Sequence, residues 1–512
     1  MEFLKDIRLI QGGMGVYVSN WRLARAVAMA RPGQTVGTVS GTALDVVYVR
    51  LLQLGDPGGH ARRALAAFDA QFATSVGKRI CDEYFIEGGK APHDRFKSAP
   101  LQVIRAPNGR GPLHIPAGTT SVAITLDEEI IELLIATGFA EVWLAKEGHT
   151  GNIFMNFLHK IEMPLIYILY GAMLAGVDGV IVGAGNPDGL PATAARLAVH
   201  EPVSKKLTVL YQEVGEEFRI GFDPKRICGG AFTKQPLKRP AFLAIASLDD
   251  LVTALAESQS GPPDGFIIEH HTAGGHNANP SGPLKKDDLG QPIYSPKDEP
   301  DLDAIRDVGR PFWLAGGYGS SEGLQRALAQ GAAGVQVGSA FALAEDSGLW
   351  APYRSAILDK LRNGADDDTL VRTTLYSPTG FSFKVAQIET TLADPEVFEQ
   401  RHRLCDIGLL QQLGLTKPNG DGSRQIFQRC PAGPIEGYVN KRGLERNTED
   451  KRCLCNGLLA CAGFGQTHHT HGTLYEEPAI VTLGNDLTGI RRLSRQGQTN
   501  YWAQDVVADI MG

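Results

Sequence analysis

The chain lacks an excess of positive charge, a dense set of cysteines and a secretion signal. Its 512 residues carry 50 lysines and arginines against 57 aspartates and glutamates, which gives a net charge of −7. Nucleic acid and anionic membranes are therefore not expected as partners, because both attract basic surfaces. Seven cysteines, an odd number spread over a long chain, indicate reduced intracellular thiols rather than a disulfide framework. The N-terminus is charged and has no apolar signal-peptide core, so we expect a cytoplasmic protein.

Long hydrophobic runs are also missing. The most apolar stretch, residues 164–185, is interrupted by Asp178 and by several glycines. Its two apolar runs, residues 165–170 and 180–182, are of strand length, whereas a membrane-spanning helix needs about 20 apolar residues. The sequence predicts two buried strands joined by a short helix here, and no membrane span.

Glycine and a regular alternation of strand and helix patterns are what the chain does have. It contains 60 glycines and 43% apolar residues, which is typical of a folded, turn-rich α/β protein. About eight apolar runs of strand type precede residue 340, and this number favours a (β/α)8 TIM barrel over a doubly wound sheet. The ten candidate runs from which about eight barrel strands are expected lie at residues 7–10, 34–39, 122–125, 141–145, 164–170, 179–182, 241–245, 265–268, 312–315 and 334–337.

Residues 266–280 form the stretch around which a site is expected. An apolar run ends at Glu269 and passes directly into histidines and glycines, with Ala-Gly-Gly-His at residues 273–276. Buried parallel strands deliver polar groups to the carboxyl edge of a sheet in this way. Gly274 and Gly275 allow the backbone to approach a flat ligand, and the His276 ring can then stand beside it. The alternative is a polar loop with solvated histidines.

Glycine-rich turns also follow several other predicted strands. They lie at residues 11–15 (Gln-Gly-Gly-Met-Gly), 183–187, 316–321 (Gly-Gly-Tyr-Gly-Ser-Ser) and 338–340 (Gly-Ser-Ala). The last two close the strand–helix series, where (β/α)8 barrels bind phosphate with backbone N–H groups. Each turn is a weak signal alone, and their order along the chain carries the inference.

Five motifs in this order resemble the nitronate monooxygenase (2-nitropropane dioxygenase-like) family of FMN-dependent TIM barrels. They are Ile-Gln-Gly-Gly-Met-Gly at 10–15, Lys-Glu-Gly-His-Thr-Gly at 146–151, Thr-Ala-Gly-Gly-His-Asn at 272–277, Ala-Gly-Gly at 315–317 and Gly-Val-Gln-Val-Gly-Ser at 334–339. The motifs are also similar to the flavin enoyl reductases of fatty-acid and polyunsaturated-lipid synthesis. The resemblance covers about residues 7–345.

The resemblance implies a role for each matching position. His276 would be the catalytic base, and the cofactor would be FMN. Its binding residues would be Gly13 and Met14 along the ring, Lys146 at the ribityl chain or ring edge, Gly185, Gly274 and Gly275 at the backbone approach, and Gly316, Gly317, Gly338 and Ser339 at the phosphate. The histidines at 270 and 271 depart from the smaller residues common there, so chemistry on the substrate side is open.

The rest of the chain exceeds a minimal family member. We expect an FMN-binding barrel over residues 1–350, with a helical and irregular insertion at 43–118, and a mostly helical C-terminal extension at 351–512 that packs on the barrel. Residues 377–384 read as a loop that either caps the substrate pocket or merely connects elements at the surface.

Four C-terminal cysteines raise the question of zinc or an iron–sulfur cluster, namely Cys430, Cys453, Cys455 and Cys461. Their spacing is not the usual Cys-x2-Cys, so we predict buried thiols and no metal. His468, His469 and His471 are read as a polar loop.

The sequence thus predicts an FMN-dependent oxidoreductase of nitronate monooxygenase type, in which His276 takes a proton from a small carbon acid. The first alternative is an FMN-dependent enoyl-thioester reductase of the fatty-acid, polyketide or polyunsaturated-lipid type. The second is a flavin-binding subunit without catalysis. The expected partners are a small-molecule substrate with O2 or NAD(P)H, and a homo-oligomer is left open.

Overall fold

Eight parallel strands close into a barrel, as the computed structural model shows for residues 2–104, 112–470, 473–495 and 500–512. Their order around the barrel is β1-β14-β13-β11-β10-β6-β5-β2. The predicted fold class, a (β/α)8 TIM barrel, is confirmed. The strands are β1 (Leu9–Gln11), β2 (Thr35–Ser40), β5 (Asn152–Leu158), β6 (Gly179–Gly183), β10 (Ala241–Ala246), β11 (Gly265–Glu269), β13 (Phe312–Ala315) and β14 (Gly334–Val337).

The inside of the barrel is a packed core rather than a channel. Seven of the strands each direct one large or branched side chain inward, and these form a single buried cluster. Filling of this kind is usual for an eight-stranded barrel. The inward side chains are Ile10, Val36, Phe154, Ile181, Leu243, Ile267 and Trp313.

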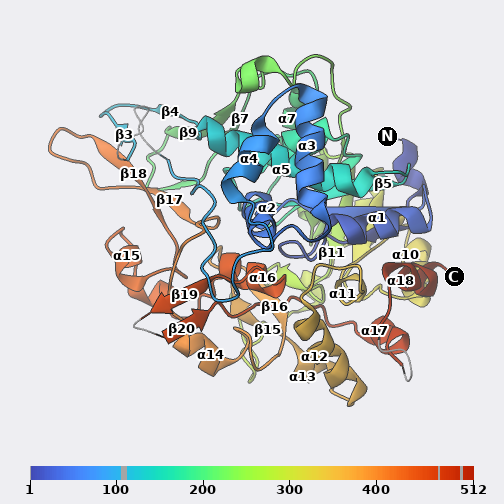
Figure 1. The fold of residues 1–512 in the computed structure, drawn as a ribbon. Helices are drawn as coiled ribbons and strands as arrows, with labels where there is room; N and C mark the ends of the chain where they lie inside the picture. The colour runs from blue at the N-terminus through green and yellow to red at the C-terminus, as the bar shows by residue number, and fades with distance from the viewer. Residues whose placement is uncertain (1, 105–111, 471–472, 496–499) are drawn as a thin grey trace.

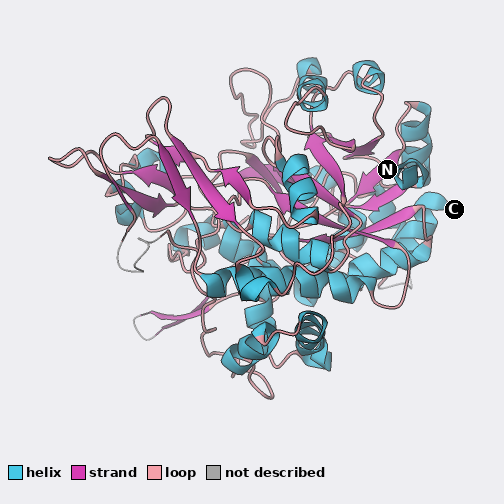
Figure 2. Cartoon of the chain, turned by 90° about the horizontal axis from the view of Figure 1, so that it is seen from above, coloured by secondary structure: helices cyan, strands magenta, loops and turns pink. Residues whose placement is uncertain are grey.

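Helices surround the barrel (Figures 1 and 2). Because the strands are buried on both faces, they read as apolar runs in the sequence. The surrounding helices are α1 (Trp21–Ala30), α5 (Glu128–Lys146), α6 (Leu165–Leu174), α7 (Leu190–Ala198), α8 (Asp249–Ala256), α9 (Leu302–Asp307), α10 (Ser321–Ala329) and α11 (Ser339–Ala342).

Two predicted strands are helices instead. Residues 165–170 belong to α6, and residues 141–145 belong to α5, whose 19 residues are almost entirely buried. The two helices pack closely, because a Cβ on Gly138 would lie 2.7 Å from the Ile168 carbonyl oxygen and one on Gly171 would lie 2.1 Å from that of Ile135. A helix buried on all sides has no polar face, so its sequence cannot be told from a strand by periodicity.

The insertion between β2 and β5 carries helices and contributes one strand to each of two small sheets outside the barrel. Its helices α2 (Leu44–Gln53), α3 (His60–Phe72) and α4 (Val76–Tyr84) pack around α5. The predicted strand near residue 122 exists as β4 (Ser121–Ile124), but it lies outside the barrel in the sheet β4-β9-β7. The other strands of these sheets are β3 (His114–Ile115), β7 (Val203–Lys206), β8 (Val209–Leu210) and β9 (Glu217–Phe222).

The C-terminal region returns to the barrel at two places. Strand β16 pairs with β12 (Gly275–Asn277), which follows β11, and helix α18 contacts α1 and α10 (Figure 1). The elements are α12 (Ala351–Arg362), α13 (Asp367–Leu370), β15 (Val371–Tyr376), β16 (Ser382–Ala386), α14 (Pro395–Gln400), β17 (Gln412–Leu415), β18 (Arg424–Arg429), α15 (Ile435–Val439), α16 (Leu454–Cys461), β19 (Thr467–Thr470), β20 (Thr473–Glu476), α17 (Thr488–Leu493) and α18 (Ala503–Met511). The domain division at residue 350 stays a prediction.

Short 3-10 helices complete the secondary structure. They are η1 (Glu2–Asp6), η2 (Pro57–Gly59), η3 (Ile227–Gly230), η4 (Pro296–Asp298) and η5 (Glu445–Thr448). Within the described ranges, none of the helices combines the length and the apolar character that crossing a bilayer requires. Of the three C-terminal histidines, His468 and His469 lie in β19, and His471 falls outside the described residues.

Candidate active site

A cavity of about 400 Å³ opens where the barrel strands end. Its walls come from the segments that follow β1, β5, β6, β10, β11, β13 and β14, which is the end of the barrel that carries active sites in this fold. The C-terminal region supplies further walls, namely Phe381 and Phe383 near β16, Leu458 on α16 and residues 482–484 before α17. The segment 377–384 therefore does line the pocket, as the capping interpretation required.

The structure brings ten of the eleven predicted site residues to this cavity. They are Gly13, Met14, Gly185, Gly274, Gly275, His276, Gly316, Gly317, Gly338 and Ser339. These positions come from five separate loops, and closure of the barrel brings these loops together at one end.

The glycines fall into two groups. At Gly13 a Cβ would lie 2.0 Å from the Asn156 side chain, and at Gly274 it would lie 2.7 Å from the backbone of Leu483. These two glycines are thus required by the protein's own packing. At Gly275, Gly317 and Gly338, by contrast, no atom lies closer than 3.5 Å to a Cβ in that position. At the latter three positions the backbone is open to a ligand.

Lys146 is the exception, and its predicted place at the cofactor is wrong. It is the last residue of α5, and its Nζ lies 2.6 Å from Asp178 Oδ2. The same oxygen of Asp178 accepts a hydrogen bond from the backbone of Ile153 at the start of β5. Lys146 therefore lies at the amino ends of the barrel strands, whereas the cavity lies at their carboxyl ends. Since residues 141–145 are helical, no strand carries Lys146 to the site.

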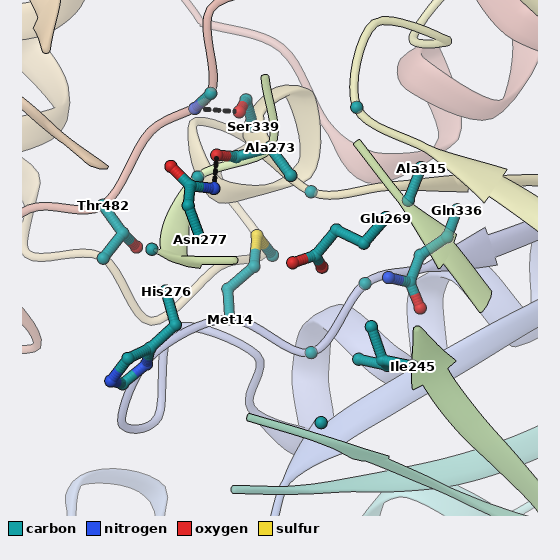
Figure 3. Close-up of a pocket in the computed structure, with 18 of the residues that line it drawn as sticks. Met14, Ile245, Glu269, Ala273, His276, Asn277, Ala315, Gln336, Ser339 and Thr482 are labelled. Carbon is teal, nitrogen blue, oxygen red and sulfur yellow. Dashed lines mark hydrogen bonds between the residues drawn. The ribbon is translucent and has the colours of Figure 1, made fainter. Parts of the chain in front are cut away.

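His276 lies on β12 at the cavity wall. Its Nε2 is 3.0 Å from Ser377 Oγ, and the edges of Phe381 and Phe383 meet its ring. Burial lowers the pKa of His276 to about 4, so the imidazole is neutral at physiological pH. In Figure 3 the ring points away from Glu269 and from the Met14 sulfur.

Glu269 is a second titratable group that the motifs did not single out. It ends β11 and lines the cavity, and Figure 3 shows its carboxylate directed toward Met14 and the middle of the site. Burial raises the pKa of Glu269 to about 7, and the nearby Lys384 ammonium opposes this rise. Its place at a strand end was the available signal. Its pKa is set by burial and by the opposing charge of Lys384, which is distant in the sequence.

The Lys384 side chain connects the C-terminal region to the strand-end loop. Its Nζ donates to the His271 carbonyl oxygen at 2.6 Å and also to the Asn485 side chain. Burial lowers the pKa of Lys384 to about 8, while Glu269 opposes this shift. Of this pair, Glu269 lines the cavity, whereas Lys384 lies behind its wall.

The phosphate-type loops meet the segment before α17. The Ser339 hydroxyl accepts a hydrogen bond of 2.8 Å from the Gly484 N–H, as Figure 3 shows. Gly316 and Gly317 have φ values of +85° and +79°, a conformation that glycine adopts without strain. The loops after β13 and β14 are adjacent because these two strands are neighbours in the barrel.

Two histidines and a carboxylate lie at the edge of the site. His270 Nε2 is 2.9 Å from Glu299 Oε1, and His271 Nε2 is 4.0 Å from the same oxygen. Within the described residues, this is the one group of three whose donor atoms all fall within 4.8 Å of one another. Imidazole and carboxylate are ligands that zinc and other transition metals accept.

Comparison with known proteins connects this geometry to one family. Residues 194–377 match the family model described as nitronate monooxygenase, so the predicted resemblance is confirmed. The matched segment contains Ala-Gly-Gly-His and both loops of the phosphate type, and it leaves out the motifs at 10–15 and 146–151. No curated protein matches the chain in sequence.

Three solved structures illustrate the structural similarity. FabK from Thermotoga maritima is 12% identical, with a TM-score of 0.42 over 100% of this chain and 93% of the other. Nitroalkane oxidase from Streptomyces ansochromogenes is 14% identical, with a TM-score of 0.44 over 99% and 95%. The enoyl reductase domain of MlnA from the macrolactin biosynthesis cluster of Bacillus amyloliquefaciens is 10% identical, with a TM-score of 0.44 over 98% and 92%.

Proposed function

We propose that this chain, whose residues 194–377 match the nitronate monooxygenase family model, is an FMN-dependent oxidoreductase that oxidises a small carbon acid with His276 as the base. The observation that carries the proposal is the meeting of three elements in one cavity. The Gly-Gly-His strand β12 and the loops that follow β13 and β14 all line it. A barrel uses such loops for a phosphate and the remaining walls for a planar ring.

The residues present suit FMN. Gly275, Gly317 and Gly338 leave open space where a ligand can approach the backbone, and the cavity of about 400 Å³ is of the size that small-molecule ligands occupy. Apolar walls for a ring come from Ile245 and Val337. Gly13 and Met14 line the same cavity. A bound flavin would supply the electron chemistry, while the protein supplies orientation and electrostatics.

His276 can hold and accept a proton at a defined atom. With Nε2–H donating to Ser377 Oγ, the lone pair remains on Nδ1, for which the described residues provide no hydrogen-bond partner. Because its pKa is lowered to about 4, the ring is in its basic form throughout the neutral range. Phe381 and Phe383 fix the ring plane, so that the ring is held ready before substrate enters.

Reduction of an enoyl thioester by NAD(P)H is the alternative reaction. The observation that favours it is Glu269, a carboxyl at the cavity wall whose pKa is raised to about 7 and which can therefore donate a proton at neutral pH. A flavin-binding subunit without catalysis is the third possibility. That role does not explain why two titratable groups with strongly shifted pKa values line the same cavity.

Cofactor release followed by two assays tests the proposal. The purified protein is expected to be yellow, and denaturation is expected to release FMN without a covalent link. Oxygen consumption with a neutral nitroalkane, which still carries its acidic proton, supports the carbon-acid oxidation, whereas NAD(P)H oxidation with an enoyl thioester supports the reductase. Bound flavin with neither activity favours the third role. Release of FAD, or no flavin uptake after reconstitution, contradicts the proposal.

A further inference from the structure

Four of the seven cysteines meet at a second cavity, separate from the candidate active site. Cys405, Cys430, Cys453 and Cys455 line a hollow of about 10 Å³. They come from the segment after α14, the end of β18 and the first turn of α16. All four are free thiols, and each is buried or half-buried. The remaining cysteines, Cys81, Cys228 and Cys461, do not line this hollow.

The four cysteines share one hollow, and none of them forms a disulfide. Yet no three of these four described residues have sulfurs within 4.8 Å of one another. A single tetrahedral zinc with bonds of about 2.3 Å would hold its sulfurs about 3.8 Å apart. The wider spacing of the sulfurs suits a larger metal cluster, in which a separate thiolate binds each metal ion.

A hydrogen-bond donor is directed at one of the four sulfurs. Gln411 Nε2 lies 3.5 Å from Cys405 Sγ. Donors aimed at sulfur stabilise thiolates and tune the potential of iron–sulfur clusters.

An unpaired polar atom also points to a bound group in the hollow. Asn456 lines the hollow and is only 1% exposed, and its Oδ1 has no hydrogen-bond partner among the described residues. A buried amide oxygen without a partner is costly and needs a reason.

Buried thiols often serve simply as small hydrophobic side chains. That role explains burial, but it does not explain why four of them share one hollow with a buried, unpaired amide oxygen. We propose that Cys405, Cys430, Cys453 and Cys455 hold an iron–sulfur cluster of the four-iron type. This replaces the prediction of no metal that followed from the irregular Cys-x-Cys spacing at residues 453–455. Cys461, the fourth cysteine considered from the sequence, does not line the hollow, whereas Cys405 does.

The proposed cluster site is adjacent to the wall of the flavin cavity. Leu458 lines that cavity, and it lies three residues after Cys455 on the same helix, α16. On the other side, Pro378 lines the hollow while its neighbour Ser377 binds His276. The cluster and the candidate active site therefore share structural elements, although the cluster proposal does not depend on the identity of the flavin reaction.

Anaerobic preparation of the full chain tests the proposal. The protein is reconstituted with ferrous iron and sulfide, and iron, acid-labile sulfide and zinc are then counted. We expect about four irons and four sulfides per chain, with an electron paramagnetic resonance signal after reduction. Cys430→Ala and Cys453→Ala are expected to lose the iron. Cys461→Ala, a buried cysteine on α16 outside the hollow, is the matched control and is expected to retain it.

The outcomes separate cleanly. One zinc per chain without sulfide, or no iron after reconstitution, overturns the assignment, and so does equal iron loss in the Cys461 control. Zinc bound at the edge of the active site is distinguished from zinc bound by the cysteines, because only the former would be lost in the Glu299→Gln variant. Should a cysteine variant fail to fold by circular dichroism, the metal count of the unaltered chain still decides. The resonance signal needs no flavin, so a missing flavin does not affect the result.

Discussion

The pH dependence of turnover identifies which group takes the proton. Two candidates line the cavity and have very different pKa values, about 4 for His276 and about 7 for Glu269. Burial causes both shifts, because it disfavours the charged imidazolium in one case and the charged carboxylate in the other. A neutral nitroalkane is the suitable substrate, since its own proton then has to be removed by the protein.

If His276 is the base, kcat/KM stays within about twofold between about pH 5.5 and pH 8, because the ring is neutral throughout. If Glu269 is the base, only about 3% of the carboxyl is ionised at about pH 5.5, so kcat/KM falls roughly 30-fold. We expect the flat profile. A tenfold fall per pH unit below pH 7, abolished in Glu269→Gln, would refute the role of His276.

Substitution of the histidine completes this test. His276→Ala is expected to lower turnover by about 10²–10⁴-fold and to leave the flavin content unchanged, because Gly274 and Gly275 contribute only backbone. Little loss of stability is expected, since Ser377 Oγ keeps Thr379 Oγ1 as a partner at 2.7 Å. The matched control is His200→Ala, which removes a buried histidine outside the cavity and should lower the melting temperature without changing turnover per flavin.

Three further predictions concern stability. Lys146→Met should leave the flavin content unchanged and lower the free energy of unfolding by about 1 kcal/mol, because Asp178 keeps Lys238 as a partner at 3.3 Å. Weaker flavin binding when the variant is titrated with flavin would contradict the placement of Lys146 away from the cavity. Glu477→Gln leaves the buried Arg401 charge unpaired, so denaturant unfolding should show a loss of about 3–5 kcal/mol, and a loss below about 1 kcal/mol would contradict the buried pair. Burial raises the pKa of Glu269 from 4.5 to about 7, so its stabilising contribution is complete below pH 4.5 and is lost as the pH rises toward 7. Glu269→Gln should flatten the pH dependence of the melting temperature in that window, and an unchanged slope would argue against the shift.

The fold class was accessible from the sequence because barrel strands are buried on both faces. Such strands appear as short apolar runs, and the glycine loops that follow them keep their order along the chain. Fully buried helices give the same short apolar runs, so residues 141–145 and 165–170 were wrongly predicted to be strands. The strand at Ser121–Ile124 was found, but its place in a side sheet depends on pairing with β9, which no local pattern reveals.

For the candidate site, the sequence indicated which residues stand at strand ends, and His276 and the glycine loops do line the cavity. Only the tertiary structure decided which end of the barrel each residue occupies, and it moved Lys146 to the end opposite the cavity. The pKa of Glu269 and the meeting of Cys405 with Cys430, Cys453 and Cys455 were likewise decided in space. The physical reason is that desolvation and proximity are set by segments distant in the chain, whereas a sequence motif records only its own neighbours.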